Sequence, residues 1–193
     1  MQNSEALRSA LNAVTFEPDE LAYLALTSKP ELQVRDRLAW RLLRSAHVAG
    51  REWKRADLVL LNEDLRPRAV LEVKAAYTAD FQRHPMAYRK NIINDMSKAH
   101  RLAPQAEAFA LVVVTHVHNP VPRSMHNLVK YDRLLSRVAD RERADANLRA
   151  SLELLGPIYR RALGTGTAFG LKASVDAWLC GPVSPQAPRS GAT

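Results

Sequence analysis

Apolar residues gather in two short runs that predict the centre of the fold. The segments 55–61 and 69–74 are rich in valine and leucine, and a polar connection that contains Pro67 separates them. Short apolar runs bounded by turn residues are typical of β-strands. The seven-residue connection 62–68 suits a hairpin. We therefore expect the two runs to pair as antiparallel strands about a centre near Leu65.

A third apolar run and the helix before it predict the fold class. The segment 109–115 is apolar without alternation, as expected of a strand that is covered on both faces. The segment 89–102 places Ile92 and Met96 at helical spacing and stops before Pro104. Strand, helix and covered strand in this order form a right-handed crossover between parallel strands. We predict an α/β fold with a mixed central β-sheet flanked by α-helices.

The other segments complete the expected domain. We expect helices over 4–14, 18–26, from 28 to about 46, 124–138 and 144–162, strands over 46–54 and 175–179, a loop over 75–85 and a turn at 164–166. The helix over 144–162 should bend or break at Gly156-Pro157. Residues 1–180 should form one domain, and the segment 181–193, rich in Pro, Ser and Gly, a flexible tail.

Three charged residues interrupt the apolar pattern of the predicted hairpin. Antiparallel pairing brings Asp57 across from the step between Glu72 and Lys74, which project from one face of their strand. Charges in such a run are costly to bury unless they pair with each other or with a metal. One explanation is a salt bridge between strands on a half-exposed sheet. The other is a Mg²⁺ ion held by Asp57 and Glu72 for phosphodiester hydrolysis.

The order of an Asp, a turn, and an apolar strand that ends in Glu-x-Lys resembles the PD-(D/E)xK nuclease superfamily. The resemblance implies a restriction-endonuclease-like core in which Asp57 and Glu72 bind metal and Lys74 positions or activates the attacking water. It also implies Mg²⁺ as the cofactor, with Mn²⁺ able to substitute, and DNA as the favoured substrate. Ala56 stands where the name-giving Pro would be, a position that the superfamily varies.

Glu31 is a third candidate ligand with a competing structural role. It shares a helix stripe with Leu38 and Leu42, each within about 20° of it, so it should face the core. The resemblance offers the role of an additional metal-binding carboxylate from this helix. Alternatively, Ser28-x-x-Glu31 is a capping box, in which Glu31 bonds the backbone of Ser28. Asp36 points the other way and is a weaker substitute.

Four residues are candidates for nucleic-acid contact. Tyr77, Arg83 and His84 lie in the loop that we expect directly after the catalytic strand, where loops commonly meet substrate. Lys98 lies three residues after Asp95, which predicts an ion pair within the helix. The resemblance also allows Lys98 to contact a phosphate, because members often present a polar residue from this helix.

The pair His116 and His118 carries less weight as a metal site. It follows the covered strand and precedes Pro120 and Pro122, as is typical of a strand end that enters a loop.

Composition and charge bound the function. The 193-residue chain has a net charge of +8. One explanation is a polyanionic partner such as nucleic acid, and the other is that the charge only keeps the protein soluble. Its one cysteine, Cys180, excludes an internal disulfide and a cysteine-based zinc site. No apolar run approaches the ~20 residues of a membrane span, and the first residues lack a signal-peptide pattern. We expect a cytoplasmic protein without a membrane partner.

These observations favour a Mg²⁺-dependent nuclease, with DNA endonuclease as the first interpretation. A single-site domain that cuts both strands would favour a homodimer. One alternative keeps the fold without the chemistry, as a nucleic-acid-binding or assembly subunit. Another makes RNA the substrate.

Overall fold

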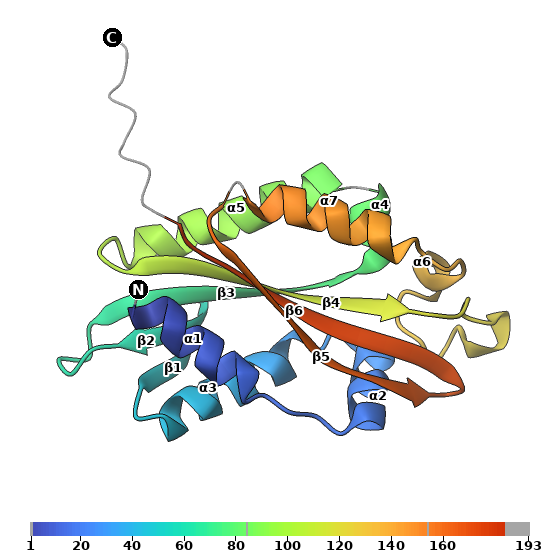
Figure 1. Cartoon of the computed structure of the whole chain (residues 1–193), viewed down its shortest axis with the longest axis horizontal. Coiled ribbons are helices and arrows are strands. Elements are labelled where there is room, and N and C mark those ends of the chain that lie inside the picture. The colour runs from blue at the N-terminus through green and yellow to red at the C-terminus, as the bar shows by residue number, and fades with distance from the viewer. Residues whose placement is uncertain (1, 84, 154, 184–193) are drawn as a thin grey trace, which may run out of the picture.

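A computed structural model describes residues 2–83, 85–153 and 155–183. Its elements, drawn in Figure 1, are α1 (Gln2–Asn12), α2 (Pro18–Thr27), α3 (Glu31–Arg44), β1 (Val48–Trp53), β2 (Ala56–Leu61), β3 (Pro67–Tyr77), α4 (Thr78–Arg83), α5 (Pro85–Leu102), β4 (Glu107–Val117), the 3₁₀ turn η1 (Arg123–Met125), α6 (Asp132–Leu135), α7 (Arg141–Glu153), β5 (Ile158–Ala168) and β6 (Leu171–Val183).

The strands form one six-stranded mixed sheet in the order β1-β2-β3-β4-β6-β5. β3 and β4 run parallel, and the other four neighbouring pairs are antiparallel. The predicted α/β class and the mixed central sheet are therefore confirmed. The chain passes through α4 and α5 between the two parallel strands, in the order that the apolar pattern predicts.

Helices cover both faces of the sheet, with α1, α2 and α3 on one side and α4, α5 and α7 on the other (Figure 1). The alternation of β3 divides its side chains between the two layers. Leu71 and Val73 pack into the core beside α1 and α3. Val70 packs with Ala99 of α5 on the opposite face. Replacing a buried leucine such as Leu71 by alanine should cost about 2–5 kcal/mol of stability.

The central strand β4 is buried at every position after Glu107, as the unbroken apolar run predicts. Leu111 and Val113 face the layer that contains α1 and α3. Ala110 and Val112 face the layer that contains α7. Because both faces are covered, no polar alternation is needed along this strand.

The structure corrects several predicted elements. The segment 75–85 is not a loop, because β3 continues to Tyr77 and α4 follows. The predicted helix over 124–138 is replaced by η1, α6 and turns, and α7 ends at Glu153 where the predicted helix was to continue. The segment 158–168 forms β5, which pairs along its length with β6. Pairing with the next strand therefore outweighs the helical spacing of this segment.

The predicted turn at 164–166 is strand instead, and Gly166 has a packing role there. A Cβ atom at this position would lie 1.9 Å from the carbonyl oxygen of Pro18. The glycine therefore allows the start of α2 to lie against β5, a close approach that a larger residue would prevent.

The last strand contains the predicted segment 175–179 and extends well beyond it. β6 includes Gly181–Val183, the first three residues of the predicted tail, and residues 184–193 lie outside the described part. Among the described helices, none has the length and apolar character needed to cross a membrane.

Candidate active site

The candidate site forms where the pairing between β2 and β3 ends. The register pairs Leu58 with Leu71, so that Asp57 and Glu72 are the next residues along the two strands. β3 continues to Tyr77 alongside β4 on its other edge. A cleft of about 520 Å³ lies here, lined by Glu31, Leu32, Arg35, Lys54, Arg55, Asp57, Glu72, Val73, Lys74, Asp95, Lys98, Arg101 and Leu102.

Carboxylates occupy the edge of β3 that β2 leaves uncovered. Asp57 Oδ2 accepts the N–H of Val73 at 2.7 Å, Glu31 Oε2 that of Ala75 at 2.8 Å, and Asp80 Oδ2 that of Tyr77 at 2.8 Å. A buried backbone N–H without a partner is costly. The side chains therefore replace the hydrogen bonds that a neighbouring strand would supply, and they hold Asp57 and Glu31 at the cleft.

The contact between Glu31 and Ala75 also decides between two predicted roles. Ser28 ends α2, where its N–H and hydroxyl both donate to the carbonyl of Leu24. The N-cap of α3 is Pro30, without a side-chain capping bond. The capping-box interpretation of Glu31 is therefore wrong, because Ser28 belongs to the preceding helix. The predicted inward direction of Glu31 agrees with its place in the cleft.

Glu72 carries the largest electrostatic perturbation among the carboxylates of the cleft. Burial raises the pKa of Glu72 to about 8, and the neighbouring carboxylates of Asp57 and Asp95 add to the increase against the lowering effect of Lys74. The carboxyl thus resists ionisation mainly because its charged form is poorly hydrated in the cleft, and the two nearby carboxylates add to this effect. A bound cation would favour the ionised form of Glu72.

Lys74 reaches from β3 to Asp95 on α5, with Nζ 2.8 Å from Oδ2. Asp95 also pairs with Lys98 at 3.0 Å, which confirms the predicted pair within the helix. Burial by itself would lower the pKa of Lys74, but Asp95 outweighs this effect and the pKa is raised. Burial likewise raises the pKa of Asp95, and the two lysines reverse the shift to a lowered value.

The donor set fits a hard divalent cation with few protein ligands. Asp57 and Glu72 offer carboxylate oxygens, and Mg²⁺ commonly takes one or two such ligands while it keeps several waters. Within residues 2–83, 85–153 and 155–183, no group of three or more His, Cys, Asp or Glu side chains is arranged to hold a metal ion. The fit is thus to a water-rich ion rather than to a site enclosed by protein.

The predicted contact residues have different outcomes. Lys98 lines the cleft with 63% of its side chain exposed. Tyr77 is only 2% exposed and its hydroxyl donates to the carbonyl of Ala25 at 3.0 Å, so its predicted role in nucleic-acid contact is wrong. Burial follows from the extension of β3 into the predicted loop. Arg83 ends α4, while its side chain and the whole of His84 lie outside the described residues.

Sequence reasoning missed several charged residues of the cleft. The sequence predicted an ion pair of Asp95 with Lys98 only. Because α5 covers β3 in the crossover, however, Asp95 on the inner side of α5 also reaches Lys74. Lys54, Arg55 and Arg101 also line the cleft. The signal for Lys54 and Arg55 was their position directly before Asp57, in the turn that opens its strand. Asp36, the weaker substitute for Glu31, pairs instead with Arg35 and Arg51.

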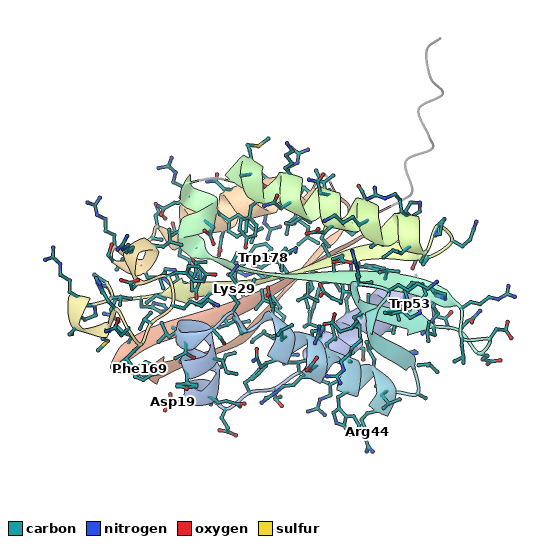
Figure 2. The ribbon with its side chains drawn as sticks, turned by 180° about the vertical axis from the view of Figure 1, so that it is seen from behind. Asp19, Lys29, Arg44, Trp53, Phe169 and Trp178 are labelled. Carbon is teal, nitrogen blue, oxygen red and sulfur yellow. The ribbon has the colours of Figure 1, made fainter. Side chains whose placement is uncertain are left out.

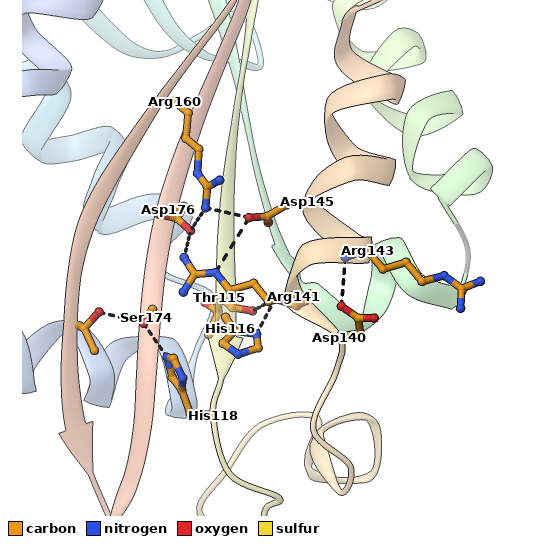
Figure 3. A network of polar contacts seen from close by, with 12 residues as sticks. Thr115, His116, His118, Asp140, Arg141, Arg143, Asp145, Arg160, Ser174 and Asp176 are labelled. Carbon is orange, nitrogen blue, oxygen red and sulfur yellow. Dashed lines mark hydrogen bonds and ion pairs between the residues drawn. The ribbon is translucent and has the colours of Figure 1, made fainter.

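A second polar cluster lies outside the cleft, between β5, β6 and α7 (Figure 3). Asp176, 4% exposed, pairs with Arg141 and with Arg160, and Arg160 also contacts Asp145 at 2.8 Å. Such a buried network is balanced in charge, two acids with two arginines. It is best explained as a structural link between α7 and the sheet.

The two histidines lie beside this cluster. His116 belongs to β4 and contacts the hydroxyl of Thr78 at 3.2 Å, while His118 contacts that of Ser174 at 2.7 Å. Burial lowers the pKa of His116 to about 4. The placement agrees with the low weight given to a metal pair here, because each ring already has a hydroxyl partner.

The fold and the cleft define an α/β protein with a mixed six-stranded sheet and an acidic and basic cleft at the end of the β2–β3 pairing. Comparisons with protein-family models, with curated proteins and with solved structures find no match for this chain.

Proposed function

We propose that this protein is a Mg²⁺-dependent nuclease of the PD-(D/E)xK type, with DNA as the favoured substrate. The observation that carries the proposal is that Asp57, Glu72 and Lys74 line one cleft, where burial and the nearby carboxylates of Asp57 and Asp95 raise the pKa of Glu72 to about 8. Perturbed carboxyls in a cleft are typical of functional sites. The net charge of +8 supports a polyanionic substrate.

The proposal assigns roles to the carboxylates of the cleft and to Lys74. Asp57 and Glu72 would hold Mg²⁺, with Glu31 as a further candidate through the oxygen that does not bond Ala75. When bound, Mg²⁺ lowers the pKa of its water and offsets charge on the scissile phosphate. Lys74 orients the attacking water or neutralises charge that builds on the phosphate. Asp95 keeps Lys74 protonated and directed into the cleft.

A second candidate function has its own structural support. Asp57 and Glu31 already satisfy backbone N–H groups of β3, and Lys74 already has an ion-pair partner. These contacts are what a purely structural charge cluster would need. In that case the protein would bind nucleic acid or act as an assembly subunit without cleaving.

Incubation of plasmid DNA and of RNA with the protein, in Mg²⁺ or in EDTA, separates the candidates. We expect Mg²⁺-dependent cleavage of DNA by the wild type, its loss in Glu72→Ala and Asp57→Ala, and unchanged cleavage in the control Arg143→Ala, whose exposed side chain lies on α7. Full activity in either carboxylate variant would reject the site. Binding without cleavage of either substrate would favour the subunit, and cleavage of RNA alone would change the substrate. Mn²⁺ should substitute for Mg²⁺.

Cutting of both DNA strands would further require two copies of the single site. A homodimer is therefore part of the proposal for double-strand cleavage, and sedimentation with and without a DNA duplex tests it.

A further inference from the structure

The cleft continues into a second hollow, so that the site lies within a longer groove. The second hollow, of about 330 Å³, shares Glu31, Lys74, Asp95 and Lys98 with the first and adds Lys29, Tyr88, Asn91 and Asn94. Figure 2 shows Lys29 and Trp53, the residue before Lys54, at separate places along the sheet below α5. The candidate catalytic residues therefore lie partway along a groove, as a chain-like substrate requires.

A tight turn at one end of this groove has an unusual backbone. Trp53 pairs with Ala56 across the hairpin of β1 and β2, which leaves only Lys54 and Arg55 as the connection. Their φ angles are +48° and +77°. Two-residue turns with two positive φ angles strongly favour Asn-Gly, because side chains with a Cβ are strained there. The sequence thus keeps two long cationic side chains where a less strained pair is available.

The charges of this turn have no acidic partners in the described part of the chain. Six cationic and four carboxylate side chains line the cleft. Arg35 pairs with Asp36 and Glu52, while Lys74 and Lys98 share Asp95. Among described residues, the remaining three form no ion pair: Lys54, Arg55 and Arg101.

The side chain of Lys54 is also held in place. Its Nζ lies 4.8 Å from the centre of the Trp53 ring, a cation–π contact that restricts the ammonium. Strained backbone conformations often occur at binding sites, where the surrounding structure maintains them. This strained turn carries two unpaired cations, one of them ordered by an aromatic ring. It is therefore suited to bind a polyanion and hold it in a fixed position.

We propose that Lys54, Arg55 and Arg101 form a phosphate clamp that holds the nucleic-acid backbone beside Glu72. The clamp would serve the proposed nuclease, so this inference rests on the proposed function. Its binding of nucleic acid can nevertheless be measured without cleavage. It contacts phosphate groups, which DNA and RNA share and which carry no sequence information. The clamp therefore positions the backbone in the groove without selecting a base sequence.

The double substitution Lys54→Asn with Arg55→Gly tests the clamp, because it removes both charges and supplies the preferred turn residues. We expect the melting temperature to rise by about 2–4 °C as strain is relieved. Binding to a short DNA duplex in EDTA should weaken about tenfold at 0.1 M salt, and the slope of log affinity against log salt should fall by about 2. Arg101→Ala should lower this slope by about 1.

The matched control removes two exposed arginines outside the groove, Arg137 and Arg143, both as alanine. This control removes as much positive charge as the turn variant does. It should nevertheless leave the slope of log affinity against log salt at the wild-type value. Equal losses for the clamp variants are expected on two DNA duplexes of unrelated sequence and on an RNA duplex. A loss confined to one sequence would overturn the clamp.

Wild-type slopes in both the turn variant and Arg101→Ala would also overturn it. If the turn variant fails to fold, Arg101→Ala alone decides, because its helix is not altered. The proposed chemistry has a separate outcome. A protein that binds with the predicted slopes but never cleaves would retain the clamp and reject the nuclease.

Discussion

Glu31 Oε2 accepts a hydrogen bond from the backbone N–H of Ala75 at 2.8 Å, across 44 positions of sequence. The contact fixes the first residue of α3 to the stretch of β3 that β2 does not cover. It thereby gives Glu31 a structural role at the same place where a metal ligand would be useful. The two roles can be separated, because one needs only an oxygen and the other needs its charge.

Glu31→Gln should keep the fold and lower cleavage. The amide oxygen can still accept from Ala75, so we expect a loss of about 1 kcal/mol or less in stability. A neutral oxygen is a poorer Mg²⁺ ligand, so cleavage should fall at least tenfold, about 1.4 kcal/mol of barrier. Higher Mg²⁺ should partly restore it. Normal activity with unaltered Mg²⁺ dependence would remove Glu31 from the metal site.

Glu72 should make the metal-free protein less stable as pH rises. Its pKa is raised in the folded state to about 8, so its contribution is fully present below the unfolded pKa near 4.5 and is lost as pH rises through 8. Glu72→Gln should abolish this decline, measured as the free energy of unfolding in EDTA from pH 5 to 9. Mg²⁺ at pH 8 should stabilise the wild type more than the variant. Parallel pH profiles for the two proteins would contradict the shift.

Asp95 should act as a positioning residue for Lys74. Asp95→Asn should reduce turnover about tenfold and move the alkaline limb of the pH–rate profile to lower pH, because the carboxylate raises the pKa of Lys74. Lys74→Ala should lose most turnover while metal binding persists. The control is Lys98→Ala, which removes the other partner of Asp95 and should leave the alkaline limb in place. If the alkaline limb of Asp95→Asn lies at the same pH as in the wild type, Asp95 has only a structural role.

Tyr77→Phe should lower the stability of the fold without weakening nucleic-acid binding. The lost bond to Ala25 leaves a carbonyl without its partner, so the variant should be destabilised by about 1–2 kcal/mol in chemical denaturation. Affinity for a DNA duplex should match the wild type, because the ring is buried. Weakened binding by the folded variant would return Tyr77 to the contact surface.

Asp176→Ala should cause the largest loss of stability among these variants. Removal of the buried acid leaves Arg141 and Arg160, which are 32% and 33% exposed, with Asp145 as their remaining acidic partner (Figure 3). The loss should be about 3 kcal/mol, the lower end of the cost of breaking a buried pair, because water reaches the arginines. Cleavage per folded molecule should stay unchanged, since the cluster does not line the cleft. The half-exposed Asp145 should be less costly to replace.

Local pattern alone determined the centre of this protein. Short apolar runs, a turn between them, and the two-residue repeat of a strand were sufficient to predict that Asp57 would lie across from the step between Glu72 and Lys74, and Asp57 accepts the N–H of Val73 there. The covered strand and the preceding helix were likewise predictable, because their signals lie within one continuous segment of chain.

Only the tertiary structure decided which distant groups complete the cleft. Asp95 meets Lys74 because α5 packs across β3, and Glu31 meets Ala75 because β2 ends early and leaves an N–H without a strand partner. The β5 and β6 pair was misread because pairing with the next strand, together with the packing of the remote α2 against β5, overrides local helical spacing. Gly166 lies in a strand that pairs with Ala173, and a glycine is needed there because Pro18 approaches it closely. Each of these outcomes depends on contacts between remote segments, which local periodicity does not encode.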